Sequence, residues 1–559
     1  MITIGGEPAV NAAPSRPTTV KTAVTSSHPY AKAGHRKVRL VKVSRPQDAR
    51  LKPGHAAAPR RAIPLLVPPS RSAKGRAGDA PRVAATKVVA KRGASVLANF
   101  DGVSAIDNKT AAAFDLEPPD EGLGAGHGFV VNFVNVTGAV YDTRGAVVQP
   151  PFFLNTFFGE PADANTSDPR VYFDANVGRW FATMLAYSFT EDGTAIAESH
   201  LDVAASDSSD PTDSWHVYRV DASSPTHGGC PCLGDYPILG VDGTNVYVST
   251  QEFTGDLQSY NGAQLYILPV SELVAGRSSV HLATFENLQA DGSLAFRVQF
   301  ANEPRSAPAE LAMSTIDWTG DGDNRVVVWA VTHRKALARG RMPALSSRVI
   351  STEGYFPAPP TQTPPGYCDA CDAPTSGLVD SGPDAMYETQ FLHGKLVGAL
   401  ATGVNVAGDS APRAGIGWLV VAPRVRHGQV TGGTRVQRQG YLASNGLGLL
   451  YPHVNMTANG SMAMAMGLGG PGTYLSAATS VAPRGGRFGP IRMIAPGVTT
   501  DNGFTGTEDF GGVGRWGDYS NGQVIPGTNR VWLATQYIPG EGDANANWGN
   551  RIWQLKIGR

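Results

Sequence analysis

Short runs of alternating or uniformly apolar residues recur along the chain after about residue 95. Each run is rich in β-branched and aromatic residues and is bounded by Gly, Asn, Asp or Pro, which is typical of β-strands joined by turns. No stretch of convincing length has the 3.6-residue period of an amphipathic helix. Clusters of strand-like runs lie at residues 128–142, 171–218, 236–268, 325–331, 394–421, 453–466 and 518–557.

This spacing predicts an all-β fold in which one small sheet is repeated. Six or seven units of roughly 45 to 65 residues fit the chain, and such a period is typical of a β-propeller with four-stranded blades. The run 551–557 alternates well, and we expect this last strand to complete the first blade and close the ring. Closure removes the exposed sheet edges.

A turn motif almost recurs within this pattern. Gly234-Asp235-Tyr236-Pro237 precedes one β-rich stretch, and Arg515-Trp516-Gly517-Asp518-Tyr519-Ser520 precedes another. Gly and Asp are common in turns between strands. We therefore interpret Asp235 and Asp518 as carboxylates that accept backbone N–H groups in their turns, with Tyr236 and Tyr519 packed between blades.

The first 95 residues differ in composition from the rest of the chain. The 559 residues carry no formal net charge, yet residues 1–100 hold 19 Lys and Arg against 3 Asp and Glu. Tyr30 is the only aromatic residue before Phe100, so this segment has little apolar surface to bury. The prediction is a disordered basic leader over residues 1–95 and a single propeller domain over residues 96–559.

The leader has two interpretations. One is a solvated linker or propeptide, and the other is a basic arm that contacts an anionic surface such as a wall polymer or lipid. Nucleic acid is not expected, because the leader does not interleave aromatic residues for base stacking with its basic residues.

The chain holds no run of about 18 apolar residues, which excludes an ordinary membrane-spanning helix. Arg60-Arg61 precedes a short apolar run in the manner of a twin-arginine signal, but prolines interrupt the run and it lies far from Met1. We expect a secreted or cell-surface protein without a clear signal peptide.

Four cysteines occur as two close pairs, Cys230/Cys232 and Cys368/Cys371, in Gly- and Pro-rich loops. Disulfides suit an extracellular propeller. The alternative is a structural zinc site, although the spacing of the first pair is unusual for zinc and no His lies close to the second. Disulfides are the favoured prediction, with the connectivity open.

Several motifs carry a resemblance to a known group. They are Pro118-Pro119-Asp120 with Gly124, Gly126 and Asn132; the Gly-Asp-Tyr segments at 234 and 515; Thr319-Gly320-Asp321-Gly322-Asp323-Asn324-Arg325; and Asn547-Trp548-Gly549-Asn550-Arg551-Ile552. Together they resemble those of uncharacterised bacterial extracellular β-propeller proteins with sialidase-like blades. Ser208-Ser209-Asp210-Pro211-Thr212-Asp213-Ser214-Trp215 is similar to the Asp box of sialidases, with Thr212 where Gly is usual. The resemblance implies a propeller, and the Asp box is a fold element without a catalytic role.

A sialidase-like hydrolase needs three arginines around a substrate carboxylate, a Tyr activated by Glu, and an Asp as acid or base. Asp235, Tyr236, Arg515, Asp518 and Tyr519 are the candidate catalytic residues. Further candidates are Arg170, Arg179, Arg325, Arg551, Glu388, Glu508 and Asp509. The arginine motif that sialidases carry in their first blade is missing, so the resemblance does not extend to a catalytic set.

Two loops place oxygen-bearing side chains at alternate positions, as calcium sites do. They contain Asp317, Asp321 and Asp323 in one loop, and Asp543, Asn545 and Asn547 in the other. Each lacks part of the calcium pattern, and an ordinary polar turn is favoured for both. No cofactor is expected, and calcium, if bound, would be structural.

The favoured functional prediction is a secreted or surface propeller that acts as a binding module for glycans or surface polymers. The alternative is a glycoside hydrolase of sialidase-like architecture. At least two arginines, a carboxylate and a tyrosine in one axial pocket would favour the hydrolase, whereas scattered arginines between blades would exclude it.

Overall fold

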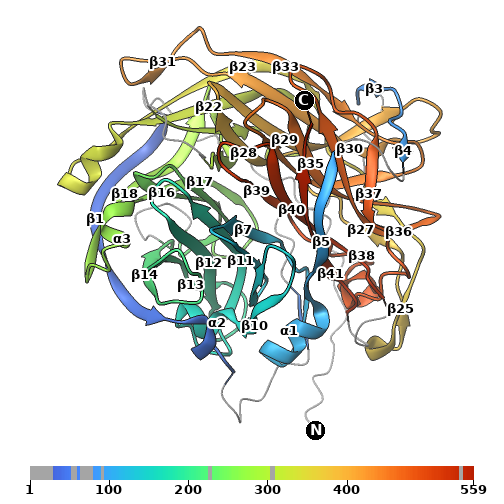
Figure 1. Ribbon diagram of the computed structural model, residues 1–559, viewed down its shortest axis with the longest axis horizontal. Helices are drawn as coiled ribbons and strands as arrows, with labels where there is room; N and C mark the ends of the chain where they lie inside the picture. The colour runs from blue at the N-terminus through green and yellow to red at the C-terminus, as the bar shows by residue number, and fades with distance from the viewer. Residues whose placement is uncertain are drawn as a thin grey trace.

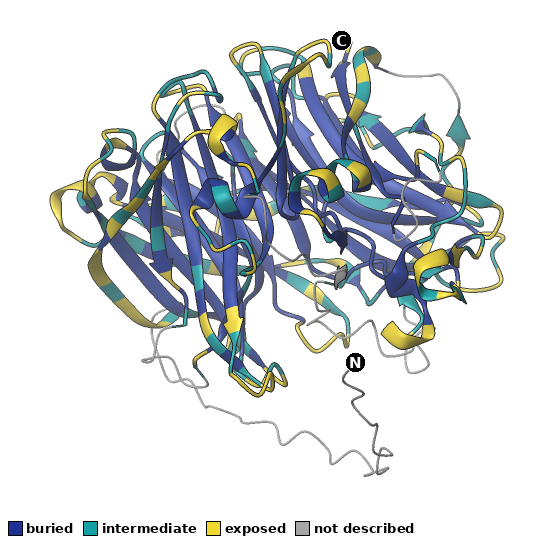
Figure 2. Ribbon diagram, turned by 90° about the horizontal axis from the view of Figure 1, so that it is seen from below, coloured by how far each residue is buried: buried dark blue, intermediate teal, exposed yellow. Residues whose placement is uncertain are grey.

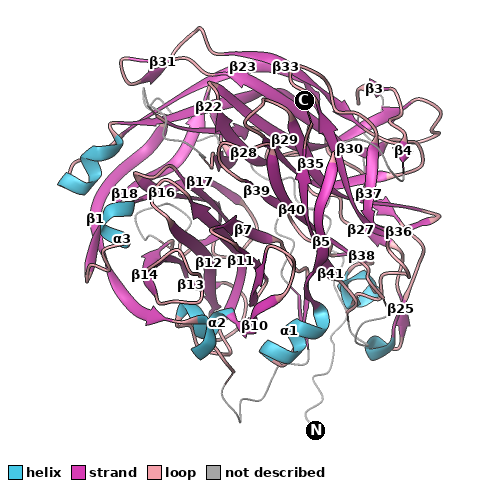
Figure 3. Ribbon diagram, in the orientation of Figure 1, coloured by secondary structure: helices cyan, strands magenta, loops and turns pink. Residues whose placement is uncertain are grey.

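The computed structural model describes residues 29–51, 60–62, 80–89, 94–223, 230–302, 309–540 and 546–558. Strands dominate the described chain, and its few helices are short, as Figure 3 shows. They are α1 (Ala105–Ala112), α2 (Leu154–Phe158) and α3 (Val270–Leu273), with five 3-10 turns, η1 (Pro46–Asp48), η2 (Arg334–Arg339), η3 (Asp369–Cys371), η4 (Phe504–Gly506) and η5 (Glu508–Phe510).

Seven four-stranded antiparallel units follow one another along the described chain, so the predicted β-propeller is confirmed with seven blades. From the axis outward, the first three are β7 (Gly122–Gly126), β8 (Phe129–Val134), β9 (Thr137–Asp142), β10 (Val147–Phe153); β11 (Asn165–Asp174), β12 (Arg179–Phe189), β13 (Ile196–Ser206), β14 (Trp215–Asp221); and β15 (Leu233–Val241), β16 (Asn245–Phe253), β17 (Tyr260–Pro269), β18 (Ser279–Ala290).

Blades 4 to 7 have the same order. They are β20 (Phe296–Phe300), β21 (Glu310–Thr315), β22 (Asp323–Thr332), β23 (Ala344–Tyr355); β28 (Met386–Leu392), β29 (Lys395–Val406), β30 (Arg413–Ala422), β33 (Arg435–Leu442); β34 (Gly448–Met456), β35 (Met462–Gly470), β36 (Thr473–Ala482), β37 (Ile491–Ala495); and β39 (Asn521–Val524), β40 (Arg530–Tyr537), β41 (Gly549–Lys556), β5 (Ser95–Ser104). Each innermost strand contacts that of the next blade, and β39 contacts β7 to complete the ring.

Ring closure differs from the expectation that the last strand completes the first blade. The N-terminal strand β5 instead forms the outer strand of blade 7 and pairs antiparallel with β41, with Phe100 opposite Ile552 (Figure 1). The two ends of the domain are therefore joined by a sheet ladder, which also covers the outer edge of β41.

The blades are buried on both faces, because each sheet packs against the next. In β16 and β35 every residue is buried, and Figure 2 places the exposed residues mainly in loops and turns. Two-sided burial explains why many strands are continuous apolar runs. The turn after β15 is a representative connection: Gly243 has φ +74°, and Asp242 Oδ1 accepts the N–H groups of Thr244 and Asn245, each at 2.8 Å.

The leader contains a long strand, so the expectation of a disordered segment over residues 1–95 is corrected for its described part. β1 (Tyr30–Ser44) pairs with β18 over residues 30–39 and with β14 over residues 40–44, joining the outer edges of blades 2 and 3. It curves along the edge of the molecule in Figure 1. Pairing with two preformed strand edges supplies the contacts that the leader's own composition lacks.

Short strands elsewhere add to the edges of the blades or bridge loops. They are β2 (Arg60–Ala62) with β6 (Asp115–Glu117); β3 (Arg82–Val83) with β29; β4 (Val88–Val89) with β37; β19 (Ser293–Leu294) with β18; β24 (Thr361–Gln362), β27 (Leu378–Val379) and β38 (Val513–Gly514); β25 (Tyr367–Cys368) with β26 (Ala373–Pro374); and β31 (Val425–Arg426) with β32 (Gln429–Val430). Residues 1–28, within the predicted leader, lie outside the described residues. No helix in the described chain is long and apolar enough to cross a membrane.

The segment that is similar to an Asp box forms the turn between β13 and β14. Asp210 Oδ1 accepts the N–H and hydroxyl of Thr212 at 2.9 and 2.7 Å. The Trp215 side chain is 1% exposed and donates its indole N–H to the carbonyl of Pro211 at 2.9 Å. These residues stabilise a turn in blade 2, away from the axis.

Candidate functional site at the propeller axis

The two Gly-Asp-Tyr motifs meet at the axis of the ring. Tyr236 belongs to β15 of blade 3, and Tyr519 lies just before β39 of blade 7. Their rings are edge to face with centroids 5.2 Å apart, and the Tyr236 hydroxyl donates to the carbonyl of Asp518 at 3.3 Å. The tyrosines, from blades 3 and 7, therefore pack against each other across the axis.

Two buried arginines stack on these tyrosines. The Cζ atom of Arg170, on β11, lies 3.2 Å from the ring centroid of Tyr519 and 5.1 Å from that of Tyr236. The Cζ atom of Arg297, on β20, lies 3.9 Å from the ring centroid of Tyr236 and 4.9 Å from that of Tyr387. Both arginines are 3% exposed. Stacking on a ring face stabilises a guanidinium. Its N–H groups lie in the guanidinium plane and stay free to bind acceptors.

A third arginine, Arg515, holds carboxylates of two blades. Its Nη2 atom donates to Asp518 Oδ2 at 3.1 Å, and its Nη1 atom lies 3.8 Å from Asp380 Oδ2. Asp380 also accepts the hydroxyl of Tyr451 at 2.8 Å. Arg515 thus neutralises acidic groups that face the axis.

Carboxylates from two further positions of the repeat complete the cluster. Asp120 Oδ1 accepts the backbone N–H of Asp518 at 2.6 Å, and Asp168 accepts the hydroxyl of Ser167 at 2.9 Å. One oxygen each of Asp120, Asp168 and Asp518 lies within 4.8 Å of the other two, so these residues could hold a cation. Arg515 already supplies a positive charge to Asp518.

Burial changes the protonation of these acids. It raises the pKa of Asp168 and of Asp235 to about 7, and nearby carboxylates, including Asp518, add to both shifts. Burial also raises the pKa of Glu388 to about 7 and that of Asp120 well above its usual range. Below neutral pH most of these groups are uncharged, and the positive charge of the three arginines exceeds the remaining negative charge.

Access to the cluster is narrow. Asp518 has 17% of its side chain exposed and Asp235 is half-buried, whereas the two tyrosines are 1% and 2% exposed. A cavity about the size of one water molecule is lined in part by Arg170, Asn302 and Glu388. A sugar ring does not fit into it.

Some donors in this region have no acceptor among the described residues. They are Nε and Nη2 of Arg170 and Nε and Nη1 of Arg297, all of them buried. A buried N–H group without an acceptor is unfavourable, and a small anion or a water molecule would satisfy it. The arrangement is suited to holding an anionic group.

The same geometry is less suited to a tyrosine nucleophile. Burial raises the pKa of Tyr236 to about 12 and that of Tyr519 well above its usual range, so both hydroxyls stay protonated. A nucleophilic Tyr needs a base to accept its proton, and the Tyr236 hydroxyl donates to a backbone carbonyl instead.

The structure brings together only some of the residues proposed from the sequence. Asp235, Tyr236, Arg515, Asp518 and Tyr519 meet at the axis with Arg170 and Glu388. The others lie elsewhere: Arg179 donates to the Gly178 carbonyl, Arg325 pairs with Asp323 and Asp291, Arg551 pairs with Asp101 within blade 7, and Glu508 and Asp509 are exposed in η5.

Other axial residues were missed from the sequence: Asp168, Arg297, Asp380, Tyr387 and Tyr451. A usable signal existed for two of them. Asp168-Pro169 and Tyr451-Pro452 repeat the pattern of Tyr236-Pro237, and all three residues before Pro have positive φ, at 55°, 48° and 54°. Arg297 has φ 51° without a following Pro, so no comparable sequence signal marks it.

The first predicted calcium loop is held by its own hydrogen bonds. Asp317 Oδ1 accepts the N–H of Asp321 at 3.1 Å and the hydroxyl of Thr319 at the same distance. Asp323 faces Arg325, with 2.8 Å between Oδ2 and Nη2. These contacts are those of a polar turn, and calcium binding stays a prediction.

The second predicted calcium loop is only partly described. Asp543 and Asn545 lie outside the described residues. Asn547 donates its amide to the carbonyls of Thr500 and Gly540 at 2.8 and 3.2 Å, and its Oδ1 accepts the N–H of Asn502 at 3.1 Å. Asn547 therefore connects two loops.

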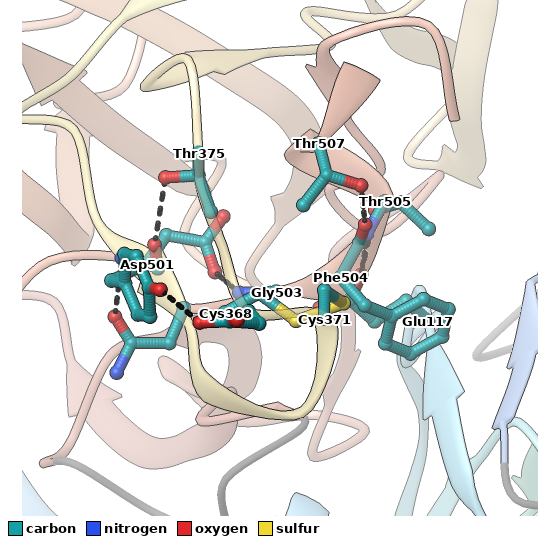
Figure 4. Close-up of a disulfide and its surroundings, with 12 residues drawn as sticks. Glu117, Cys368, Cys371, Thr375, Asp501, Gly503, Phe504, Thr505 and Thr507 are labelled. Carbon is teal, nitrogen blue, oxygen red and sulfur yellow. Dashed lines mark hydrogen bonds between the residues drawn. A yellow bond between two sulfur atoms is a disulfide. The ribbon is translucent and has the colours of Figure 1, made fainter. Parts of the chain in front are cut away.

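Both cysteine pairs lie at disulfide distance within their own loops, Cys230–Cys232 and Cys368–Cys371, in keeping with the favoured prediction. Figure 4 shows the second disulfide beside the loop that contains η4. Thr375 donates its hydroxyl to the Asp501 carbonyl at 3.4 Å, and Thr505 of the same loop donates its N–H and hydroxyl to Glu117 at 3.0 and 2.6 Å. The Thr505 hydroxyl also accepts the N–H of Arg515 at 2.8 Å, so this loop leads directly to the axial cluster.

No protein-family model matches the chain, and no curated protein matches it. Among solved structures, Trypanosoma rangeli sialidase in complex with sialic acid matches at 12% identity and a TM-score of 0.35, over 78% of this chain and 60% of that chain. Penicillium chrysogenum α-L-arabinanase complexed with arabinobiose matches at 11% identity and 0.33, over 70% and 95%. Phage phi92 endosialidase matches at 8% identity and 0.39, over 76% and 71%. The seven four-stranded blades of the chain itself establish the propeller.

Proposed function

We propose that this protein is a secreted or cell-surface binding module that holds an acidic group of a glycan or surface polymer at the axis of its propeller. The observation that carries the proposal is the pair of arginines from blades 2 and 4. Arg170 and Arg297 stack on tyrosine rings and have N–H groups without acceptors among the described residues. A planar guanidinium is the side chain best matched to a carboxylate.

The charge of the surrounding acids supports binding of an anion near and below neutral pH. Asp168, Asp235 and Glu388, each with a pKa of about 7, are largely protonated below neutral pH and then leave Arg170 and Arg297 with little negative charge beside them. As the pH rises through 7, the three carboxylates ionise and compete with an anionic ligand for the arginines. Binding should therefore weaken at alkaline pH.

Two disulfides support an extracytoplasmic location, because disulfides persist in oxidising compartments. Capture of one acidic group fits the narrow axial cavity better than cleavage of a buried glycosidic bond. The second candidate is a sialidase-like glycoside hydrolase. It is favoured by the gathering of three arginines, tyrosines and Glu388 in one place, and disfavoured by the depth of Tyr236 and Tyr519.

The test is a titration of the full chain with N-acetylneuraminic acid and galacturonic acid, beside a glycan array and chromogenic sialosides. We expect acidic sugars to bind in preference to neutral ones, and Arg297→Lys to weaken binding roughly tenfold through loss of the bidentate geometry. Arg325→Lys, in the same blade but 37% exposed, is the matched control and should leave binding unchanged. Thermal unfolding of each variant establishes that the fold is intact.

Preference for neutral glycans, or unaltered binding by folded Arg297→Lys, would contradict the proposal. Release of chromophore that is lost in Tyr236→Phe or Tyr519→Phe would instead establish the hydrolase.

A further inference from the structure

The outward side of β1 carries a row of exposed basic residues. Along this strand Val38 is 7% exposed and faces the sheet, while His35, Lys37 and Arg39 alternate with it and are exposed. Side chains two positions apart on a strand point to the same side at intervals of about 6.6 Å, so the row spans about 13 Å. Pairing of β1 with β18 fixes the row: Lys37 lies opposite His281, and Arg39 lies opposite Ser279.

Basic residues from two other segments flank this row. The His35 and His281 rings are stacked with centroids 5.2 Å apart. Gly340 lies close to the His35 and His281 rings, which brings its exposed neighbours Arg339 and Arg341 near the histidine pair. On the β18 side, the Leu40 N–H donates to the Ser278 carbonyl at 3.1 Å, which places the exposed Arg277 beside Arg39.

Few acids oppose these charges. Glu272 is 2% exposed and lies beneath the surface, 2.8 Å from His281 Nδ1 and 3.6 Å from Arg277 Nη1. Asp221 pairs with Arg36, which belongs to the other side of β1. Burial, His281 and Lys37 lower the pKa of His35, so the charge at neutral pH comes from the lysine and the arginines.

We propose that this basic row, made by Lys37 and Arg39 with Arg277, Arg339 and Arg341, is a second binding site, and that its ligand is a linear acidic polysaccharide. An extended row of separate charges matches a polymer with a regularly repeated carboxylate or sulfate better than it matches a single ion.

Other anionic polymers fit this surface less well. The one aromatic residue of β1, Tyr30, packs edge to face on Phe285 with centroids 4.9 Å apart, so it does not present a free face for stacking on a base. The row lies at the outer edge of blades 2 and 3, whereas the axial arginines lie between the innermost strands. The two proposed sites can therefore succeed or fail independently.

The experiment measures binding of the full chain to polygalacturonate, with neutral dextran as the uncharged comparison. The double variant Lys37→Gln/Arg39→Gln should weaken polygalacturonate binding by roughly threefold to tenfold, since each exposed charge pair contributes modestly. Arg484→Gln/Arg487→Gln removes the same charge from an exposed loop of blade 6 and should leave binding unchanged. Added salt should weaken binding of the unaltered chain, because exposed charges are screened.

Equal affinity of Lys37→Gln/Arg39→Gln and the unaltered chain for polygalacturonate would overturn the inference. So would capture by phosphatidylglycerol vesicles without binding to polygalacturonate. Titration with monomeric galacturonic acid separates the two proposals. The axial variant Arg297→Lys should lose binding of the monomer. The variant Lys37→Gln/Arg39→Gln should keep binding of the monomer and lose affinity for the polymer. Loss of monomer binding in Lys37→Gln/Arg39→Gln would count against a separate site at the basic row.

Discussion

Tyr236 and Tyr519 form an edge-to-face contact with ring centroids 5.2 Å apart, although they belong to blades 3 and 7. Each ring also faces a guanidinium, because Arg297 lies over Tyr236 and Arg170 lies over Tyr519. The two copies of one turn motif thus form a single cluster across the axis. The two copies of the motif are far apart in sequence but in contact in space, because the inner strand of every blade begins near the axis.

Shortening Tyr236 should destabilise the propeller strongly. The ring is 1% exposed, and removal of a buried aromatic side chain typically costs about 3–5 kcal/mol, so Tyr236→Ala should lower the free energy of unfolding by that amount. Tyr236→Phe keeps the ring contacts and loses one hydrogen bond, with an expected cost of about 1 kcal/mol. Denaturant unfolding measures both, and Tyr367→Ala, at a site 44% exposed, is the control with little expected change.

Stability should fall as the pH rises from about 4 to about 7. The folded-state pKa values of Asp168, Asp235 and Glu388 are raised to about 7, so the folded protein binds more protons than the unfolded chain in this window. The stability that these three groups contribute is complete below their pKa in the unfolded chain. It is lost as the pH rises through their pKa in the folded protein. His453 opposes this trend, since burial lowers its pKa to about 4, but three carboxyl groups outweigh one imidazole.

The variant Asp235→Asn isolates one of these groups. An amide stays neutral at every pH, so the variant should lose on the order of 3 kcal/mol of the pH dependence between pH 4 and 7. Asp509→Asn, at an exposed position, should retain the full dependence. Urea unfolding at a series of pH values measures it, and a profile for Asp235→Asn that matches the unaltered chain would contradict the assignment.

Removal of the leader should lower the stability of the propeller without opening its ring. A protein that starts at residue 94 keeps β5 and its pairing with β41 but loses β1 from the edges of blades 2 and 3, together with the short strands β2, β3 and β4. We expect a lower midpoint of thermal unfolding and a retained β-sheet circular dichroism spectrum. A protein that starts at residue 105 loses β5 as well and exposes the β41 edge, so it should aggregate. Equal stability of the full chain and the first truncation would show that β1 pairing contributes nothing.

The two disulfides should contribute little to global stability. Each closes a loop with a sequence separation of 2 or 3 residues, and the entropy removed from the unfolded chain grows with loop length. Replacing either pair by serine should cost less than about 2 kcal/mol in denaturant unfolding. Alkylation of the denatured protein, followed by mass spectrometry, should label no cysteine before reduction and all 4 after it; label before reduction would refute the pairing.

Much of the fold could be predicted from the strand pattern. Every cluster of strand-like runs after residue 95 belongs to one of the seven blades, because strand and turn residues act locally. Ring closure could not be predicted, since the choice between the two termini as the source of the last strand depends on where both ends of the ring meet. The strand in the leader could not be predicted for a related reason. β1 is ordered by pairing with β14 and β18, and its own residues give only a weak local pattern of strand formation.

Only some residues of the axial site could be predicted from the sequence. The repeated Gly-Asp-Tyr motif pointed to Asp235, Tyr236, Asp518 and Tyr519, whereas nothing near Arg297 distinguishes it from an arginine on the surface. A repeated β-sheet architecture, paired cysteines and a basic leader can be predicted from the chain, because periodicity, spacing and charge are properties of neighbouring residues. Which side chains face the axis, and how burial sets their charge, follows from the packing of the blades, since these residues lie in blades that are hundreds of residues apart in the chain.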